Sequence, residues 1–306
     1  MASLAAPPVA DAPGGAVALR LLAAGCATGL AFCVHGASAH AGTAQIVLLR
    51  AALAIPPLLL WAALTAPPAD WRPRAPRRHL VRGGLGALSM ALNFYALGQL
   101  PVAHAQALSY LAPVLSIPAA VILLGERLSV RAVVAVAVGF AGMMAMLFTA
   151  MARPEWGWAE VTGMAAAVGS AGTMALVRVQ VKSMTATETT ISIALTFAVI
   201  CTALGLAAVL LAGWTPMTPA LWAWTLGAGV LGAATHVAAT ESVARASVST
   251  LAPFDYAGLV FAVALDFALF AHLPGPWGWL GIALIAAAGL LSLRAGAPEA
   301  TGLRLR

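Results

Sequence analysis

The chain has 306 residues, of which 62% are hydrophobic and 8% are charged, and its mean hydropathy is +0.94. Because roughly a quarter of the residues in a soluble domain are charged, this composition excludes a water-soluble fold. The net charge of +6 does not indicate nucleic-acid binding, since the basic residues lie between apolar runs rather than along one face. A spanning helix needs about 20 apolar residues, so the chain accommodates about ten spans and no second, soluble domain.

Residues 1–16 are rich in Pro, Ala and Gly and lack a basic segment, which predicts a disordered cytoplasmic tail rather than a signal peptide. Apolar runs then predict a first set of spans near 17–36, 43–65, 80–98, 103–124 and 130–150. A second set is predicted near 157–178, 189–212, 221–244, 247–271 and 277–294. The division before residue 247 depends on a short link around Arg245. Residues 297–306 are predicted to form a second cytoplasmic tail.

The Lys and Arg residues test this number of spans, because such residues collect in the cytoplasmic loops of membrane proteins. With both termini in the cytoplasm, ten spans place almost all of them at that face, including the basic segment from Arg72 to Arg82. Only Arg153 is placed outside, and Arg50 within the membrane. The outer links GWTPMTPALW and HLPGPWGW lack charge and carry Trp residues suited to the membrane interface. The charge distribution therefore supports the ten-span prediction independently of hydropathy.

Two successive sets of five spans predict an inverted repeat, because an odd-numbered unit duplicated in tandem inserts with the opposite orientation. The predicted repeats are residues 17–150 and 157–296. A weak similarity in pattern links LLGERLSVRAVVAVAVGFAGMM in the first to LFAHLPGPWGWLGIALIAAAGLL in the second. The predicted fold class is an all-α membrane protein of ten transmembrane helices, arranged as two inverted five-helix repeats.

Other classes of protein lack support in the sequence. Cys26, Cys33 and Cys201 lie in apolar runs without metal-ligand spacing, so we interpret them as packing residues. The chain has no H-E-x-x-H motif, phosphate loop or paired catalytic carboxylates, and no filter or charged ring typical of a channel. We therefore expect neither an enzyme nor a bound metal or cofactor.

Two segments carry a resemblance to a known family. The first half contains AQALSYLAPVLSIPAAVILLGERLSVRAVVAVAVGFAGMM, which is similar to the end of an EamA repeat of the drug/metabolite transporter superfamily. The second half contains SVARASVSTLAPFDYAGLVFAVALDFALF, which resembles a branch whose second repeat reads A-x-x-x-A-x-x-S-x-x-A-P-F-x-Y. Arg50 fits the arginine often found in the second span. The chain departs from the family at residues 271–274, where AHLP replaces an acidic residue before a proline.

The resemblance implies helices around a central cavity and secondary transport by alternating access. It implies solutes such as amino acids, vitamins or nucleoside-like metabolites. Our first hypothesis is efflux of amino acids or related compounds across a bacterial inner membrane, and the alternative is import of a vitamin-like or nucleoside-like solute such as riboflavin or S-adenosylmethionine. Protons are a candidate coupling ion, and the oligomeric state is left open.

Polar and aromatic side chains within the spans are the candidates for solute binding, because a polar group in hydrocarbon is costly unless it faces a partner or a cavity. Gln106, Tyr110 and neighbouring polar residues recur at a spacing of three and four, which places them on one helix face. For Ser and Thr, hydrogen bonding between packed helices is the favoured alternative. The substrate-binding candidates are Phe32, His35, Arg50, Ser89, Asn93, Tyr95, Gln106, Tyr110, Ser170, Thr173, His236, Thr240 and Tyr256.

Charged residues within the spans have two interpretations. Arg50 can attract a substrate carboxylate or pair with an acidic residue, and we favour pairing. Asp255 and Asp266 are the proton-coupling candidates, because a carboxyl group in an apolar environment takes up a proton more readily; Asp255 can instead form a pair near the cytoplasmic end. Glu241 lies four residues before Arg245, a spacing that predicts a local ion pair.

Overall fold

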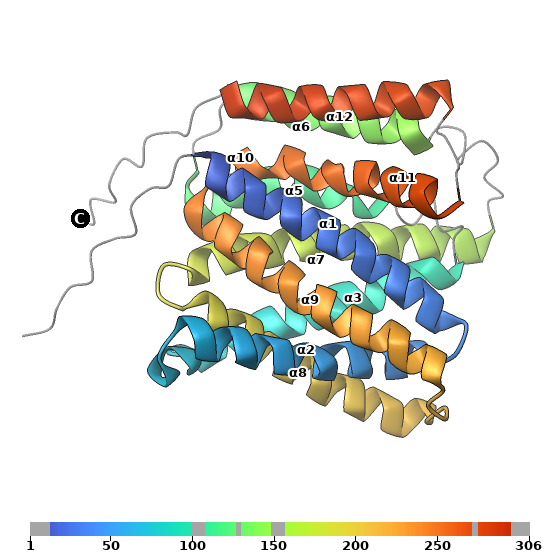
Figure 1. The fold of residues 1–306 in the computed structure, drawn as a ribbon. Coiled ribbons are helices and arrows are strands. Elements are labelled where there is room, and N and C mark those ends of the chain that lie inside the picture. Colours follow the sequence, from blue (N-terminus) through green and yellow to red (C-terminus); the bar gives the residue numbers. More distant parts are fainter. Residues whose placement is uncertain (1–12, 100–107, 127–129, 148–156, 271–274, 295–306) are drawn as a thin grey trace, which may run out of the picture.

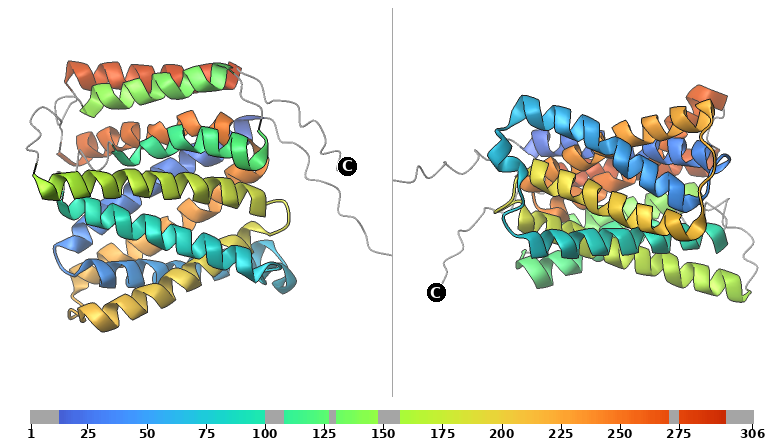
Figure 2. Two further views of the ribbon diagram at one scale, coloured as in Figure 1. Left: turned by 180° about the vertical axis from the view of Figure 1, so that it is seen from behind. Right: turned by 90° about the horizontal axis from the view of Figure 1, so that it is seen from below.

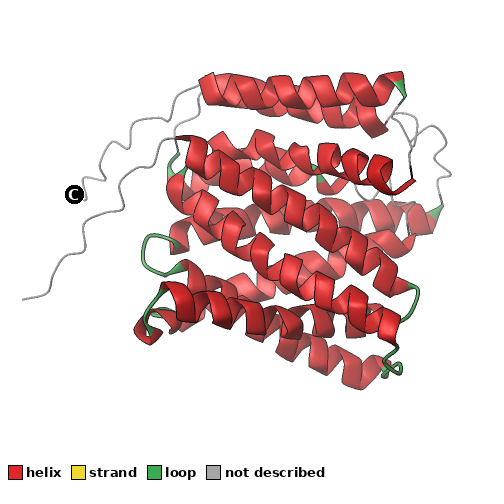
Figure 3. Ribbon diagram, in the orientation of Figure 1, coloured by secondary structure: helices red, strands yellow, loops and turns green. Residues whose placement is uncertain are grey.

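The structure is a computed structural model that describes residues 13–99, 108–126, 130–147, 157–270 and 275–294. Within these residues all regular structure is helical and no strand occurs (Figure 3). The helices of the first half are α1 (Pro13–Ser38), α2 (Thr43–Thr65), η1 (Pro68–Trp71), α3 (Pro76–Gln99), α5 (Leu111–Leu124) and α6 (Val130–Leu147). Those of the second half are α7 (Trp158–Met184), α8 (Thr190–Ala212), α9 (Pro219–Arg245), α10 (Val248–Leu251), η2 (Ala252–Tyr256), α11 (Ala257–Phe270) and α12 (Pro276–Arg294).

Among the described residues, five helical segments are long and apolar enough to cross a bilayer: Gly14–Ser38, Thr43–Thr65, Val161–Met184, Thr190–Ala212 and Val248–Leu265. Three shorter apolar helices occupy Leu111–Leu124, Val130–Ala145 and Pro276–Leu291. Each predicted span overlaps helical structure, although α1 begins at Pro13, inside the tail predicted for residues 1–16. The predicted span 103–124 begins in residues outside the described part of the chain.

The predicted division at Arg245 is confirmed, and its cause is local. Helix α9 ends at Arg245, and Ala246 is extended with φ −140° and ψ 166°. The side chain of Ser247 then accepts a hydrogen bond from the backbone N–H of Thr250 and caps α10. The predicted span 247–271 is not one regular helix, however, because the 3₁₀ segment η2, with Pro253 in its first turn, lies between α10 and α11.

The helices lie side by side and run between two ends of the molecule (Figures 1 and 2). One end carries the start of α1 and the α2–α3 and α7–α8 loops, and we call it the basic end. The opposite end carries the α1–α2 and α8–α9 loops. The main pairs are α1 with α9, α2 with α8, α3 with α7, and α6 with α12. Helix α2 also contacts α9, α3 contacts α8, α1 contacts α11, and α5 contacts α7.

Two glycines bring α2 close to its neighbours. A Cβ atom at Gly205 of α8 would lie 2.9 Å from Cα of Leu48, and one at Gly229 of α9 would lie 2.7 Å from Cβ of Leu53. Small residues permit such backbone approach between membrane helices, where dispersion contacts rather than the hydrophobic effect drive association. Helix α2 is therefore held between α8 and α9, which places Arg50 among helices of the second half.

Candidate solute-binding site

Two arginines lie in the interior of the molecule: Arg82 is buried and Arg50 is partly buried. Arg50 comes from α2 and contacts Met90 of α3, and Arg82 comes from α3 and lies against Phe197 of α8. Met90 packs against Phe197 and Cys201 of α8, and the Phe197 ring also contacts His236 of α9. We call Arg50, Arg82, Phe197, Cys201 and His236 the arginine cluster. Its members come from α2 and α3 of the first half and from α8 and α9 of the second.

Aromatic contacts position Arg82 within the arginine cluster. Its Cζ lies 3.5 Å from the centre of the Phe197 ring, a close cation–π arrangement. The same ring also contacts His236, whose ring centre is 4.8 Å away at an interplanar angle of 71°. Arg82 is 6% exposed, and its Nε and Nη1 have no hydrogen-bond partner. The guanidinium plane is thus covered while two of its donor nitrogens remain available.

Arg50 is also without an ion pair in the described part of the chain. Its Nη2 donates to Sδ of Met90 over 2.9 Å, and its Nε has no hydrogen-bond partner. A thioether is a weak acceptor, so this contact compensates the partly buried positive charge of Arg50 poorly. The pairing favoured from the sequence is therefore not found among the described residues.

A cavity of about 840 Å³ lies beside the arginine cluster, between α2, α3 and α8. Met90 and Cys201 form part of its wall, and Met90 also contacts Arg50. Towards the non-basic end the cavity is bordered by Gln45, Trp214 and Thr215. Most of the wall is apolar, so the polar groups next to it determine which solutes can bind.

Gln45 closes one side of this cavity by joining α2 to the α8–α9 loop. Its Nε2 donates to the carbonyl oxygen of Thr215 over 2.8 Å, and its Oε1 accepts from the Thr215 N–H over 2.7 Å. The Gln45 side chain is buried. This paired amide contact connects the two halves at the end opposite the basic one.

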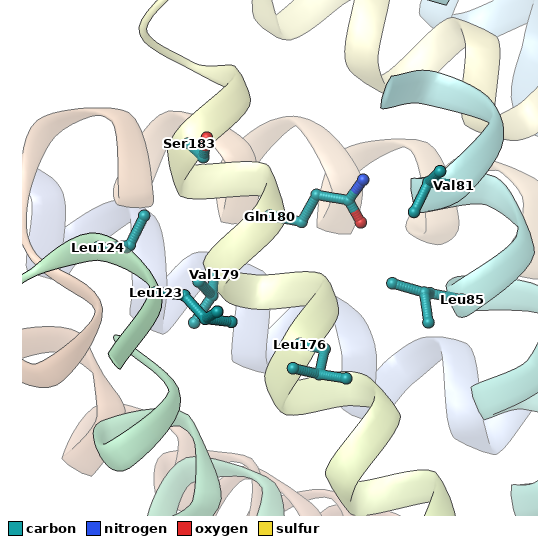
Figure 4. Close-up of a pocket in the computed structure, with 8 residues that line it drawn as sticks. All are labelled: Val81, Leu85, Leu123, Leu124, Leu176, Val179, Gln180 and Ser183. Atoms are coloured by element: carbon teal, nitrogen blue, oxygen red, sulfur yellow. The ribbon is translucent and has the colours of Figure 1, made fainter. Parts of the chain in front are cut away.

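A second cavity of about 290 Å³ lies between α3, α5 and α7 (Figure 4). Its lining is mostly aliphatic, with Gln180 and Ser183 as the polar members. The Gln180 amide points towards α3 (Figure 4) and donates to the carbonyl oxygen of Arg78 over 3.0 Å. Among the described residues no charged side chain lines this cavity, and we do not assign a solute to it.

At the basic end, Asp255 joins α1 and α7 to η2. Its Oδ1 lies 2.5 Å from Nη2 of Arg20, and its Oδ2 pairs with Nη1 of Arg178. All three side chains are less than one-fifth exposed. Asp255 thus forms the pair that the sequence suggested as the alternative to proton coupling.

Two glutamates also connect the halves at the basic end. Glu126, after α5, accepts hydrogen bonds from the backbone N–H groups of Val248 and Ser249, at 3.1 Å and 3.3 Å. Glu188, in the α7–α8 loop, accepts from the N–H groups of Arg74 and Ala75 at 3.1 Å and 2.7 Å. These carboxylates satisfy backbone donors that would otherwise be left without partners.

The groups around Glu188 lower the pKa of its carboxyl group. Burial acts to raise its pKa, but the backbone hydrogen bonds from Arg74 and Ala75, together with His79 and Ser192, outweigh burial and lower the pKa below its usual range. Nε2 of His79 lies 3.4 Å from the carboxylate, and Oγ of Ser192 lies 3.1 Å from it. The ionised carboxylate therefore stabilises the contact between the α7–α8 and α2–α3 loops.

Several of the predicted binding residues have hydrogen-bond partners within the helices. Ser89 Oγ donates to the Ser170 carbonyl over 3.1 Å, and Ser170 Oγ donates to the Ser89 carbonyl over 2.8 Å. Thr173 donates to carbonyl oxygens of its own helix. Tyr95 is 48% exposed and its hydroxyl donates to Thr162. These contacts favour helix packing for the serines.

The predicted aromatic residues form two further groups. Tyr110 and Tyr256 have ring centres 6.0 Å apart, and Tyr256 is fully buried. Phe32 contacts Trp224, with ring centres 5.7 Å apart.

The remaining predicted residues differ in their placement. Asn93 is half-buried and Thr240 is buried. Of the predicted binding residues, the structure brings Arg50 and His236 together in the arginine cluster; Gln106 and the side chains of His35 and Asp266 lie outside what the structure describes.

Arg82 was not predicted as a site residue, because its place near the start of a span suggested the cytoplasmic interface. The missed signal is helical spacing: Arg82 precedes Gly86 by four residues and Ser89 by seven, so the three share one face of α3.

The predicted ion pair of Glu241 with Arg245 is confirmed at 3.0 Å.

Comparisons with known proteins agree with this architecture. The sequence profile of the EamA-like transporter family matches residues 14–148. A riboflavin transporter of Rhizobium johnstonii is 32% identical over 230 residues, covering 74% of this chain and 73% of that protein. The pseudopaline exporter CntI of Pseudomonas aeruginosa is 26% identical over 247 residues, covering 81% of this chain and 80% of that protein. A protein of known crystal structure aligns with 91% of this chain and 96% of its own chain, with a TM-score of 0.80 and 20% identity, and therefore has the same fold.

The protein is accordingly a multi-pass membrane protein of the small-molecule transporter class. It belongs to the EamA-like transporters of the drug/metabolite transporter superfamily.

Proposed function

We propose that this protein is a secondary transporter of ten transmembrane helices, formed by two inverted five-helix repeats at residues 17–150 and 157–296, that works by alternating access. The pattern of helix pairs supports the repeat. If α1, α2, α3, α5 and α6 correspond in order to α7, α8, α9, α10 to α11, and α12, exchange of the halves converts the pair α1–α9 into α7–α3. It also converts α2–α9 into α8–α3, and α1–α11 into α7–α5, and all of these pairs occur.

The observation that carries the proposal is the position of the arginine cluster relative to this symmetry. Helices α2 and α8 correspond to each other, as do α3 and α9, so the cluster lies where the two proposed repeats meet. Many secondary transporters bind their substrate at a repeat interface near the middle of the bilayer. Rocking of one half against the other would expose the cluster to each side of the membrane in turn.

We propose efflux of amino acids or related compounds across the bacterial inner membrane, with both termini in the cytoplasm. The similarity to a pseudopaline exporter over 81% of the chain supports export. The similarity to a riboflavin transporter supports the alternative, import of a vitamin-like or nucleoside-like solute such as riboflavin or S-adenosylmethionine.

The test is flux through the purified full chain in liposomes. Radiolabelled amino acids, riboflavin and S-adenosylmethionine are each measured with and without a pH gradient, against protein-free liposomes. Saturable flux of one class identifies the solute, and dependence on the gradient identifies proton coupling. Equal flux in liposomes with and without protein for all three classes would contradict the proposed function.

A further inference from the structure

We infer that Arg50 and Arg82 together bind an anionic oxygen group of the transported solute, a carboxylate or a phosphate. This inference rests on the proposed transport function and names the chemical class of its solute.

The first argument is the unpaired charge of the two side chains. Removing an ion from water costs several kcal/mol unless a partner compensates it, and buried charges in proteins are normally paired. Arg20 and Arg178 follow this rule, because they share the Asp255 carboxylate. Among the described residues neither Arg50 nor Arg82 pairs with a carboxylate. Arg50 contacts the thioether of Met90, and Arg82 contacts the ring of Phe197.

The second argument is the orientation of the free donors. Phe197 contacts the face of the Arg82 guanidinium, so the nitrogens at its edge, Nε and Nη1, keep their capacity to donate. Arg50 likewise keeps a free Nε. The edge of a guanidinium matches two oxygens of a carboxylate or a phosphate, and such charge-assisted hydrogen bonds are about twice as strong as neutral ones.

The third argument is access from the cavity. Met90 lies in the wall of the 840 Å³ cavity and contacts Arg50. Cys201 lies in the same wall and packs in one cluster with Phe197, whose ring covers Arg82. A methionine side chain is flexible and adapts to a neighbouring group. A solute in the cavity therefore reaches the arginine cluster by displacing Met90 from Arg50. The apolar wall then contacts the remainder of the solute.

Thermal unfolding of the full chain in detergent tests the inference with matched probes: benzoate, benzamide and phenyl phosphate, titrated at constant ionic strength. Benzoate and benzamide share a ring and differ in charge, so the arginine cluster predicts stabilisation by benzoate at concentrations where benzamide has no effect. Stabilisation by phenyl phosphate alone would identify phosphate as the recognised group. Equal shifts with benzoate, phenyl phosphate and benzamide, or none with any of them, would overturn the inference.

Substitutions then locate the effect. We expect Arg50→Gln and Arg82→Gln each to weaken the apparent affinity for the stabilising anion about 10-fold to 100-fold, as loss of a charged hydrogen bond implies. Arg82→Lys should retain part of the preference for the anion over benzamide. Arg74→Gln is the matched control, because the Arg74 side chain is 66% exposed at the basic end. Anion preference that survives both Gln substitutions would contradict the assignment.

The liposome assay separates this inference from the proposed function. Anion binding that requires both arginines, without flux of any solute, would leave the site standing and remove the transport function. Flux of neutral solutes alone, without anion binding, would leave transport standing and remove the anion site.

Discussion

Asp255 of η2 and Arg20 of α1 form a buried ion pair with 2.5 Å between Oδ1 and Nη2. The same carboxylate pairs with Arg178 of α7, so one acidic group joins helices of both halves. This arrangement lies at the basic end, whereas the cavity beside the arginine cluster is bordered by Gln45 and Thr215 towards the other end. Asp255 therefore holds the basic end together in this conformation.

We expect Asp255→Asn to destabilise this conformation by about 3–5 kcal/mol, because removal of one partner leaves buried charges uncompensated. Thermal unfolding in detergent measures the loss as a lower Tm. Glu241→Gln is the control: it breaks the more exposed pair with Arg245, which has the same spacing as helix pairs contributing about 0.3–0.5 kcal/mol. Equal Tm values for the two variants would contradict the structural role of Asp255.

We expect the Glu188 carboxylate to make the stability of the folded protein depend on pH. Because its pKa is lowered in the folded protein, its contribution is fully present above the unfolded value of about 4.3 and is lost as the pH falls through the folded-state pKa. At pH 7, Glu188→Gln should cost about 1–3 kcal/mol, since Arg74 and Ala75 lose a charged acceptor. The difference in Tm between the two proteins should shrink as the pH is lowered below about 4.3. A Tm difference that stays constant over this pH range would show that protonation of Glu188 does not affect stability.

Two glycines of α9 provide a matched test of helix packing. Gly229→Ala places a Cβ 2.7 Å from Cβ of Leu53, and such overpacking costs about 1–3 kcal/mol. Gly232→Ala, one turn further along, meets no atom within 4 Å and should leave stability unchanged or raise it by up to about 1 kcal/mol, because Ala favours a helix interior more than Gly does. Thermal unfolding of both variants tests the close approach of α2 and α9, and Gly229→Ala should have the lower Tm. Equal Tm values for the two variants would exclude this close approach.

The proposed topology predicts which loops a membrane-impermeant maleimide reaches in intact cells. Ala69 and Ala39 are exposed residues in links at opposite ends of the helices. In a chain without Cys26, Cys33 and Cys201, Ala39→Cys should react from outside, whereas Ala69→Cys should react only after the cells are opened. Labelling of Ala69→Cys in intact cells would show that the basic segment from Arg72 to Arg82 is not cytoplasmic.

Proton coupling remains a prediction from the sequence. If Asp266 of α11 is the coupling group, Asp266→Asn should abolish the pH dependence of flux in liposomes while leaving flux at a fixed pH measurable. Asp255→Asn is the comparison variant, and its flux should keep the pH dependence, because the Asp255 carboxylate is already paired with Arg20 and Arg178. Unchanged pH dependence in Asp266→Asn would remove Asp266 as the coupling site.

The sequence by itself determined where the chain is helical and where one span ends. Long apolar runs must satisfy their backbone hydrogen bonds internally in a bilayer, so hydropathy alone located most helices, including the boundary at Arg245. The local pair of Glu241 with Arg245 was predictable for a similar reason, since a spacing of four residues brings side chains together on any helix.

Only the tertiary structure decided which polar groups meet. Arg20, Arg82 and Arg178 are alike in sequence, because each is a basic residue near the end of an apolar run. Packing gives Arg20 and Arg178 a shared carboxylate but places Arg82 against Phe197 with free donor nitrogens. Hydropathy measures the cost of moving each residue from water into lipid and carries no information on its neighbours from distant helices. The arginine cluster, formed by four helices from both halves of the chain, therefore becomes visible only when those helices are packed together.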